Sequence, residues 1–216
     1  MPFMIEVWSD VVCPWCYIGK RRLESALARF EHRDEVTVLW RSFELDPGAE
    51  REPEGTGAER LAAKYGMTVE EAAARQEQIT KLAAEDGLEY HLDTAHGGNT
   101  FDAHRLIQLG KERGIQDAVK ERLMRGYFTE GARIGDPEAL VALGVDAGLD
   151  VEEARTVLAS DAYAEAVRED EALAHQIGIQ GVPFFVLNRR YGVSGAQPAE
   201  VLVQALEKAA ESAEAA

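Results

Sequence analysis

The chain has 216 residues, of which 46% are hydrophobic, enough for one large domain or two small ones with a packed core. Its 39 acidic residues outnumber 23 basic ones, and the resulting net charge of −16 argues against nucleic acid or an anionic membrane as a partner. No apolar run in the sequence approaches the ~18 residues that a membrane-spanning helix needs.

The predicted elements begin with a strand at 3–8, FMIEVW, a short run rich in β-forming residues. The opening stretch MPFMIEVWSD lacks the basic and apolar regions of a signal peptide, so we expect a cytoplasmic protein. From Cys13 to Phe30, apolar residues recur at spacings of three and four, which predicts a helix. Alternation over 36–43 predicts a second strand, and the turn-rich stretch 44–55 ends this unit.

Residues 57–177 are predicted to be almost wholly helical. Capping-box patterns occur at 68–71 and 150–153, and Asp136 precedes Pro137, which suits the first position of a helix. Glycines punctuate the helical segments between these signals. We therefore expect several consecutive helices here.

The last part of the chain returns to strands. Residues 184–187 and 191–194 form a predicted β-hairpin around a tight turn, and a final amphipathic helix follows. The order β-α-β, helical block, β-β-α predicts an α/β protein. We expect one discontinuous domain of residues 1–56 and 178–216, interrupted by a helical insertion domain of residues 57–177.

The only two cysteines of the sequence, Cys13 and Cys16, lie at the start of the first predicted helix. With Pro14 at the first helical position, they stand three residues apart on one helix face, within reach of disulfide geometry. The helix N-terminus favours a thiolate at Cys13, which we expect to be exposed, whereas Cys16 lies on the buried apolar stripe. This asymmetry suits thiol–disulfide exchange: the first sulfur attacks a disulfide and the second resolves the mixed intermediate.

Two other interpretations of the cysteine pair are weaker. A structural zinc site needs four ligands, but there is one cysteine pair, and the five histidines have no i,i+4 spacing, so we predict no metal. A purely structural disulfide would close a very small loop, and a reducing cytoplasm would break it.

Four segments, SDVVCPWCYIGKRRLE, WRSFELDP, NTFDAHRL and GVPFFVLNRRYGVSGAQP, together resemble the DsbA-like family, in its cytoplasmic FrnE-like branch, from about residue 3 to residue 208. The resemblance implies a thioredoxin fold with a large all-helical insertion. It implies a protein-disulfide oxidoreductase or isomerase without a bound cofactor. The substrate would be a protein or small molecule with a disulfide or thiol. Glutathione is a candidate partner, and a homodimer is a candidate oligomeric state.

The resemblance also assigns roles to particular residues. Cys13 would be the nucleophile and Cys16 the resolving thiol. Pro183 would be a cis-proline facing the cysteine pair, and Val182 would offer backbone hydrogen bonds to an extended substrate segment. The cis assignment rests on the family, because an X–Pro bond is cis only about 5–6% of the time.

Five further residues are candidates for substrate binding. Pro14 and Trp15 separate the cysteines, and Trp15 either offers an apolar contact to substrates or packs as an ordinary aromatic. Asp10 either accepts the thiol proton or forms a turn. Asn99 is expected to cap the helix that begins at NTFDAHRL. In the family this segment lies beside the active-site cleft, so Asn99 and His104 would line it, although His104 equally fits a packing role.

Two rival classes of function remain. The glutathione-dependent 2-hydroxychromene-2-carboxylate isomerases and kappa-class glutathione transferases share this architecture but place Ser where Cys13 stands. A cysteine at both positions favours redox chemistry over this alternative. A non-catalytic chaperone-like module would instead keep its activity after loss of both thiols.

Overall fold

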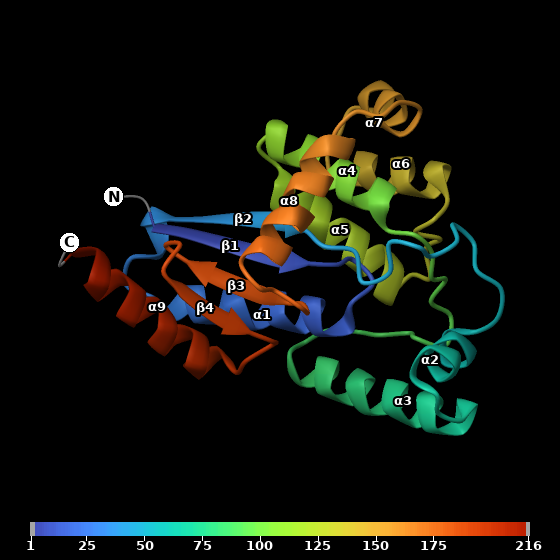
Figure 1. Ribbon diagram of the computed structural model, residues 1–216, viewed down its shortest axis with the longest axis horizontal. Helices are drawn as coiled ribbons and strands as arrows, with labels where there is room; N and C mark the ends of the chain where they lie inside the picture. Colours follow the sequence, from blue (N-terminus) through green and yellow to red (C-terminus); the bar gives the residue numbers. More distant parts are fainter. Residues whose placement is uncertain (1–2, 215–216) are drawn as a thin grey trace. The chain divides into compact units, whose positions relative to one another are not determined.

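The computed structural model describes residues 3–214 (Figure 1). Within them the chain divides into two compact units, at Leu45/Asp46 and at Ala166/Val167. The first unit combines the beginning and the end of the chain and contains the sheet. The second unit is helical and is described separately below.

Among its described residues, the first unit contains four strands and three long helices. They are β1 (Phe3–Ser9), α1 (Pro14–Arg29), the short 3₁₀ helix η1 (Arg33–Glu35), β2 (Val36–Ser42), most of α8 (Ala164–Gln176), β3 (Phe184–Leu187), β4 (Tyr191–Ser194) and α9 (Ala199–Glu214). Across the described residues the strands form one sheet in the order β2-β1-β3-β4. β1 and β2 are parallel because α1 crosses between them, and β3 and β4 are antiparallel neighbours joined by a tight turn.

The two faces of the sheet pack against different helices. Val7 of β1 stands opposite Phe185 of β3, and α1 lies close to the ring of Phe185. α9 packs beside α1 and contacts β3 and β4 (Figure 1). The next residue along β1, Trp8, points to the other face because side chains alternate along a strand. There it joins a buried cluster with Ala174 of α8 and Ile179.

A buried ion-pair network holds α8 on this second face. Arg41 of β2 donates to Glu6 of β1 at 2.5 Å and to Asp170 of α8 at 2.7 Å. Asp170 also accepts from the backbone N–H of Ser42 through its carboxylate and from the indole of Trp8 through its carbonyl. These contacts explain why the units divide at 166/167 and not at the predicted 177/178: the larger part of α8 packs with the strands.

The second unit contains six helices among its described residues. They are α2 (Gly57–Tyr65), α3 (Val69–Glu85), α4 (Phe101–Glu112), α5 (Gln116–Phe128), α6 (Pro137–Asp146) and α7 (Val151–Leu158). The predicted capping box at 68–71 and the Asp136 N-cap before Pro137 are confirmed. Asp150 caps α7 as expected. Glu153, however, pairs with Arg113 instead of completing a capping box.

The segment 46–56 also belongs to the second unit, which places the other boundary at 45/46 and not at the predicted 56/57. Its backbone lies very close to two glycines. A Cβ at Gly98 would lie 2.4 Å from the Arg51 carbonyl oxygen, and a Cβ at Gly135 would lie 1.7 Å from the same atom. Asn99 N–H donates to the Glu50 carbonyl at 2.9 Å. These backbone contacts hold the segment against the helices.

Candidate active site

The cysteine pair lies where the fold begins its first helix. Cys13 is the N-cap of α1, with extended backbone angles (φ −85°, ψ 113°), and Pro14 is the first helical residue. Proline suits this position because its fixed φ is helical and no N–H is needed there. The Cys13 carbonyl accepts from the Cys16 N–H at 3.0 Å, so both cysteines belong to the first turn. Both are thiols in this structure.

The two sulfurs are less different in exposure than the sequence suggested. Cys16 is 1% exposed, as predicted from its place on the apolar stripe. Cys13 is 3% exposed, so the prediction of an exposed Cys13 is wrong. The reason is tertiary: the Cys13 Sγ faces the backbone carbonyl of Val182 at 3.7 Å, a residue 169 positions later.

The Val182–Pro183 segment completes the surroundings of Cys13. Its peptide bond is cis. The Pro183 carbonyl accepts from the Gly195 N–H at 2.8 Å, which joins this segment to the end of β4. The first unit therefore places the Cys13 sulfur at the carbonyl of Val182, directly before Pro183.

Two other candidate residues flank the cysteines. Trp15 is 45% exposed at the first turn of α1, so its indole is available to a partner. Asp10 is buried and accepts from the Leu45 N–H at 2.8 Å, while its carbonyl accepts from the Cys13 N–H at 3.3 Å. Asp10 thus shapes the turn that leads into α1.

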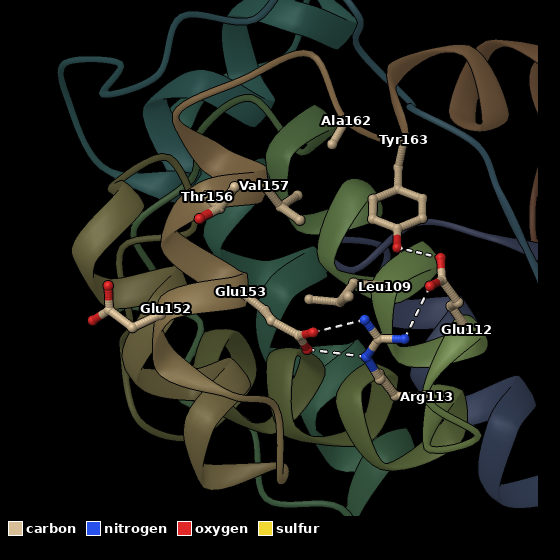
Figure 2. A pocket seen from close by; sticks show the side chains of 9 residues that line it. All are labelled: Leu109, Glu112, Arg113, Glu152, Glu153, Thr156, Val157, Ala162 and Tyr163. Carbon is tan, nitrogen blue, oxygen red and sulfur yellow. Dashed lines mark hydrogen bonds and ion pairs between the residues drawn. The ribbon is translucent and has the colours of Figure 1, made fainter.

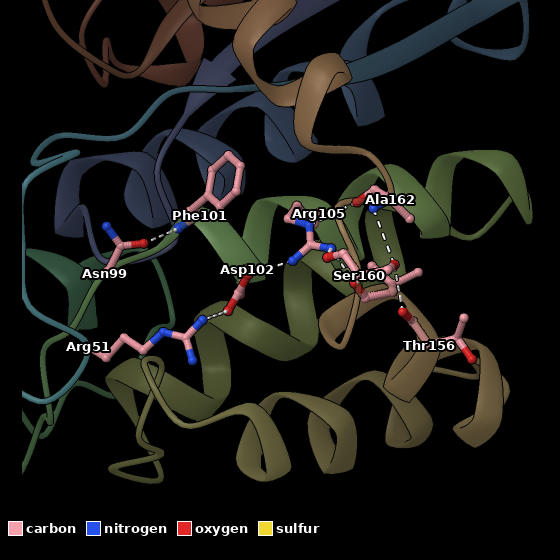
Figure 3. A network of polar contacts seen from close by, with 9 residues as sticks. Arg51, Asn99, Phe101, Asp102, Arg105, Thr156, Ser160 and Ala162 are labelled. Atoms are coloured by element: carbon pink, nitrogen blue, oxygen red, sulfur yellow. Dashed lines mark hydrogen bonds and ion pairs between the residues drawn. The ribbon is translucent and has the colours of Figure 1, made fainter.

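Asn99 and His104 belong to the second unit. The predicted N-cap at Asn99 is wrong, because α4 has Thr100 at that position. Asn99 still supports the helix start, since its Oδ1 accepts from the Phe101 N–H at 2.9 Å (Figure 3). Its amide also donates to the Pro47 carbonyl. His104 is buried within α4, which fits a packing histidine.

The same segment contains a charge network that sequence reasoning missed. Arg105 on α4 donates to the Asp102 carboxylate at 2.8 Å and to the backbone carbonyl of Ala162 at 2.8 Å (Figure 3). Its guanidinium also donates to the carbonyls of Val157 and Ser160. Arg51 pairs with the second oxygen of Asp102 at 3.0 Å. The Asp-x-x-Arg spacing in NTFDAHRL indicates the Asp102–Arg105 ion pair, because residues three apart lie on the same helix face.

An open groove of about 450 Å³ lies in the second unit, between α4, α7 and the segment around Tyr163 (Figure 2). Arg113 on its wall pairs with Glu153 at 2.7 Å and with Glu112 at 2.9 Å. Tyr163 donates its hydroxyl to Glu112 at 2.5 Å. Partial burial and this carboxylate raise the pKa of Tyr163 to about 12. Glu112, Arg113, Glu153 and Tyr163 are therefore engaged with one another, whereas Glu152 on the same groove pairs with Arg155 at 3.7 Å.

The residues that the structure describes bear on two kinds of feature, metal-ligand clusters and membrane-spanning helices. Within residues 3–214, no group of three or more His, Cys, Asp and Glu side chains is placed to hold a metal ion. The helices described there are too short or too polar to cross a bilayer.

A parallel β-α-β unit extended by an antiparallel β-β-α unit, with a Cys-x-x-Cys pair at the first helix, defines the class of thioredoxin folds. The family described as DSBA-like thioredoxin domain matches residues 4–207, and this chain belongs to it. The predicted α/β fold with a helical insertion is thereby confirmed.

Several solved structures are similar to this chain. A probable DsbA oxidoreductase, SCO1869 from Streptomyces coelicolor, is 52% identical with a TM-score of 0.92, covering 96% of this chain and 89% of that one. The cytosolic disulfide reductase DsbM from Pseudomonas aeruginosa, solved with GSH, is 18% identical with a TM-score of 0.61, covering 98% of both chains. A 2-hydroxychromene-2-carboxylate isomerase is 15% identical with a TM-score of 0.71, covering 99% of both chains. The last two show a shared fold alone.

Proposed function

We propose that this protein is a thiol–disulfide oxidoreductase of the FrnE-like type that works through its Cys-Pro-Trp-Cys sequence. The observation that carries the proposal is the position of the Cys13 Sγ, at the start of α1 and 3.7 Å from the Val182 carbonyl beside Pro183. The 52% identity to a probable DsbA oxidoreductase supports the same chemistry.

The proposed reaction has two exchange steps. The Cys13 thiolate attacks one sulfur of a substrate disulfide, which forms a mixed disulfide and releases the other substrate sulfur as a thiolate. The Cys16 sulfur then attacks Cys13, which forms the Cys13–Cys16 disulfide and releases the second substrate thiolate. The substrate gains two electrons, the cysteine pair loses two, and the two thiol protons pass to the released sulfurs. The reverse sequence oxidises a dithiol substrate.

The surroundings of Cys13 suggest how a substrate binds. The exposed indole of Trp15 offers an apolar contact beside the sulfur. The backbone of Val182, next to Pro183, would hydrogen-bond an extended peptide segment. Pro14 and Trp15 would tune the reduction potential, and Asp10 would fix the turn before Cys13. Asn99 and His104 remain proposed cleft residues of the helical domain.

The proposal extends to the setting of the reaction. We propose a cytoplasmic enzyme that needs no bound cofactor and acts on proteins or small molecules with a disulfide or thiol. Glutathione is the small thiol that we favour as its redox partner, and a homodimer is compatible with the proposal. The thioredoxin-fold part and the helical insertion would form its two domains.

The rival activity is a glutathione-dependent isomerase or transferase. The fold shared with a 2-hydroxychromene-2-carboxylate isomerase is compatible with it. Such an enzyme would bind glutathione without forming a lasting bond to Cys13 and would not depend on Cys16. The cysteine at each of the two positions favours exchange instead.

Mass spectrometry of two single variants after exposure to oxidised glutathione tests the proposal. Cys13→Ser should form no adduct and catalyse no exchange, because a hydroxyl is a far weaker nucleophile than a thiolate. Cys16→Ser should accumulate a glutathione adduct on Cys13 that dithiothreitol removes, because the internal exit from the mixed disulfide is lost.

The opposite pattern would refute the assignment. Adducts on Cys16 in the Cys13→Ser protein would make Cys16 the nucleophile. The absence of an adduct on Cys13 in the Cys16→Ser protein would show that Cys13 is not the nucleophile. Isomerase or transferase turnover that survives in Cys16→Ser would favour the rival activity.

A further inference from the structure

Gly19 is a buried glycine inside α1, three residues after Cys16. A glycine in a helix interior is less favourable than alanine by about 1 kcal/mol. The backbone does not require it, because Gly19 lies within the regular helix Pro14–Arg29 and not at its end. The reason for a glycine at this position must therefore be the space beside it.

That space is filled by the segment that faces Cys13. A Cβ at position 19 would lie 2.9 Å from Cγ of Pro183, 3.5 Å from its Cβ and 3.3 Å from Cζ of Phe185. Carbon atoms do not approach within 3.0 Å without displacement, since packed interiors have no slack for an added methyl group. A side chain at this position would therefore have to push one of the two residues away from α1.

Pro183 is the residue that would move. Phe185 is fully buried and lies within β3, where it is paired with Val7 of the central strand β1. Pro183 precedes the strand, and one backbone hydrogen bond, from the Gly195 N–H, holds its carbonyl. A displaced Pro183 ring takes the preceding Val182 carbonyl with it, away from the Cys13 sulfur.

We infer that Gly19 is a positioning residue: its missing side chain lets the Pro183 ring sit on α1 and so holds the Val182 carbonyl over the Cys13 sulfur. The inference rests on the proposed function, because this placement affects chemistry only if Cys13 is the reactive thiol. When Cys13 is protonated, its S–H donates weakly to the Val182 carbonyl, whereas the thiolate and the disulfide form have no S–H to donate. The placement therefore favours the dithiol form over the disulfide form. The equilibrium that tests this contact is therefore measured at a pH low enough to keep Cys13 protonated.

The test compares Gly19→Ala with Gly110→Ala, a matched control in the other unit. Gly110 is also buried within a helix, α4, and a Cβ there would lie 2.8 Å from Cγ2 of Val119. Both substitutions should lower the thermal unfolding temperature. Only Gly19→Ala should shift the equilibrium with reduced and oxidised glutathione, by about threefold toward the Cys13–Cys16 disulfide, the size expected for one weak hydrogen bond.

A double-mutant cycle identifies the contact responsible. Pro183→Ala removes the Cγ atom that the new Cβ would meet, so adding Gly19→Ala in that background should leave the glutathione equilibrium unchanged. An equal shift in both backgrounds would overturn the inference. If Gly19→Ala alone does not fold, Pro183→Ala should restore folding, and a double variant that still fails to fold would equally overturn it.

The outcomes for the two proposals are distinct. A wild-type protein that does not equilibrate its cysteines with glutathione would refute the proposed function. A normal wild-type equilibrium, with Gly19→Ala indistinguishable from Gly110→Ala, would refute only the positioning role of Gly19.

Discussion

Each unit contains an arginine that joins elements distant in the sequence, half-buried Arg41 in one and buried Arg105 in the other, but the two arginines bind different kinds of partner. Arg41 in the sheet unit lies between two buried carboxylates, those of Glu6 and Asp170. Arg105 in the helical unit shares one carboxylate, that of Asp102, with Arg51. The rest of its guanidinium binds backbone carbonyls at and after the end of α7 (Figure 3).

The difference shows two uses of the same side chain. Burial acts to lower the pKa of Arg41, but hydrogen bonds to Glu6 and Asp170 outweigh it and raise the pKa above its ordinary value. Arg41 therefore neutralises the buried carboxylates of Glu6 and Asp170. Buried carboxylates need a partner of opposite charge, because their attraction to it offsets the cost of removing them from water. Arg105 mainly supplies donors to helix-end carbonyls, a task that water also performs. The sheet unit should depend more strongly on its arginine.

The largest expected effect is therefore that of Arg41→Met. Removal of the cation takes from the buried Asp170 its ion pair with Arg41 and leaves the buried Glu6 with only the longer contact to Arg189 at 3.6 Å, so the free energy of unfolding should fall by about 4 kcal/mol in urea denaturation. Arg29→Met is the control, because the exposed Arg29–Glu200 pair should contribute less than about 1 kcal/mol. A loss below that of the control would show that α8 is held by apolar packing alone.

Gly135→Ala tests how much the stability of the helical unit depends on close backbone packing, as opposed to ion pairs. Its Cβ would lie 1.7 Å from the Arg51 carbonyl oxygen, so segment 46–56 must leave its place. We expect a loss of about 3 kcal/mol in the free energy of unfolding. Gly48→Ala in the same segment is the control, because the nearest atom lies at 3.8 Å. Equal stability of the two variants would contradict the tight docking of this segment.

Arg105→Met should cost less than Arg41→Met. Asp102 keeps Arg51 as an ion-pair partner, and water can reach part of the abandoned carbonyls, so we expect a loss of about 2 kcal/mol by urea denaturation. Arg155→Met, which removes an exposed pair with Glu138, serves as the control. A cost above that of Arg41→Met would reverse the comparison between the two units.

The smallest effect concerns Tyr163 in the groove of the helical unit (Figure 2). Its pKa is raised to about 12 by partial burial and by the Glu112 carboxylate, so the folded state favours the protonated phenol. The corresponding stabilisation is fully present below pH 10 or so, the ordinary tyrosine value, and fades as pH rises through about 12. The tyrosinate absorbance of the wild-type protein, minus that of Tyr163→Phe, should rise with a midpoint near pH 12. A difference curve centred near 10 would contradict it.

Local patterns predicted many of the elements. The strand at 3–8, the helix after the cysteines and the capping signals at 68–71 and Asp136 agree with the structure because each depends on neighbouring residues. The error at Asn99 is also local. Asn99 and Thr100 are adjacent helix-capping residue types, and only the backbone angles decide that Thr100 occupies the N-cap position of α4, where its side chain makes no capping hydrogen bond.

The sequence by itself determined the order of the elements and the placement of Cys13 and Cys16 on the first turn of a helix, since periodicity and spacing are properties of the chain. Tertiary structure alone decided that Cys13 is buried and that Val182, 169 residues away, faces its sulfur. It also decided that α8 packs with the sheet, through the Arg41–Asp170 contact across 129 residues. No local pattern encodes such contacts, because they depend on which distant surfaces the whole fold brings together.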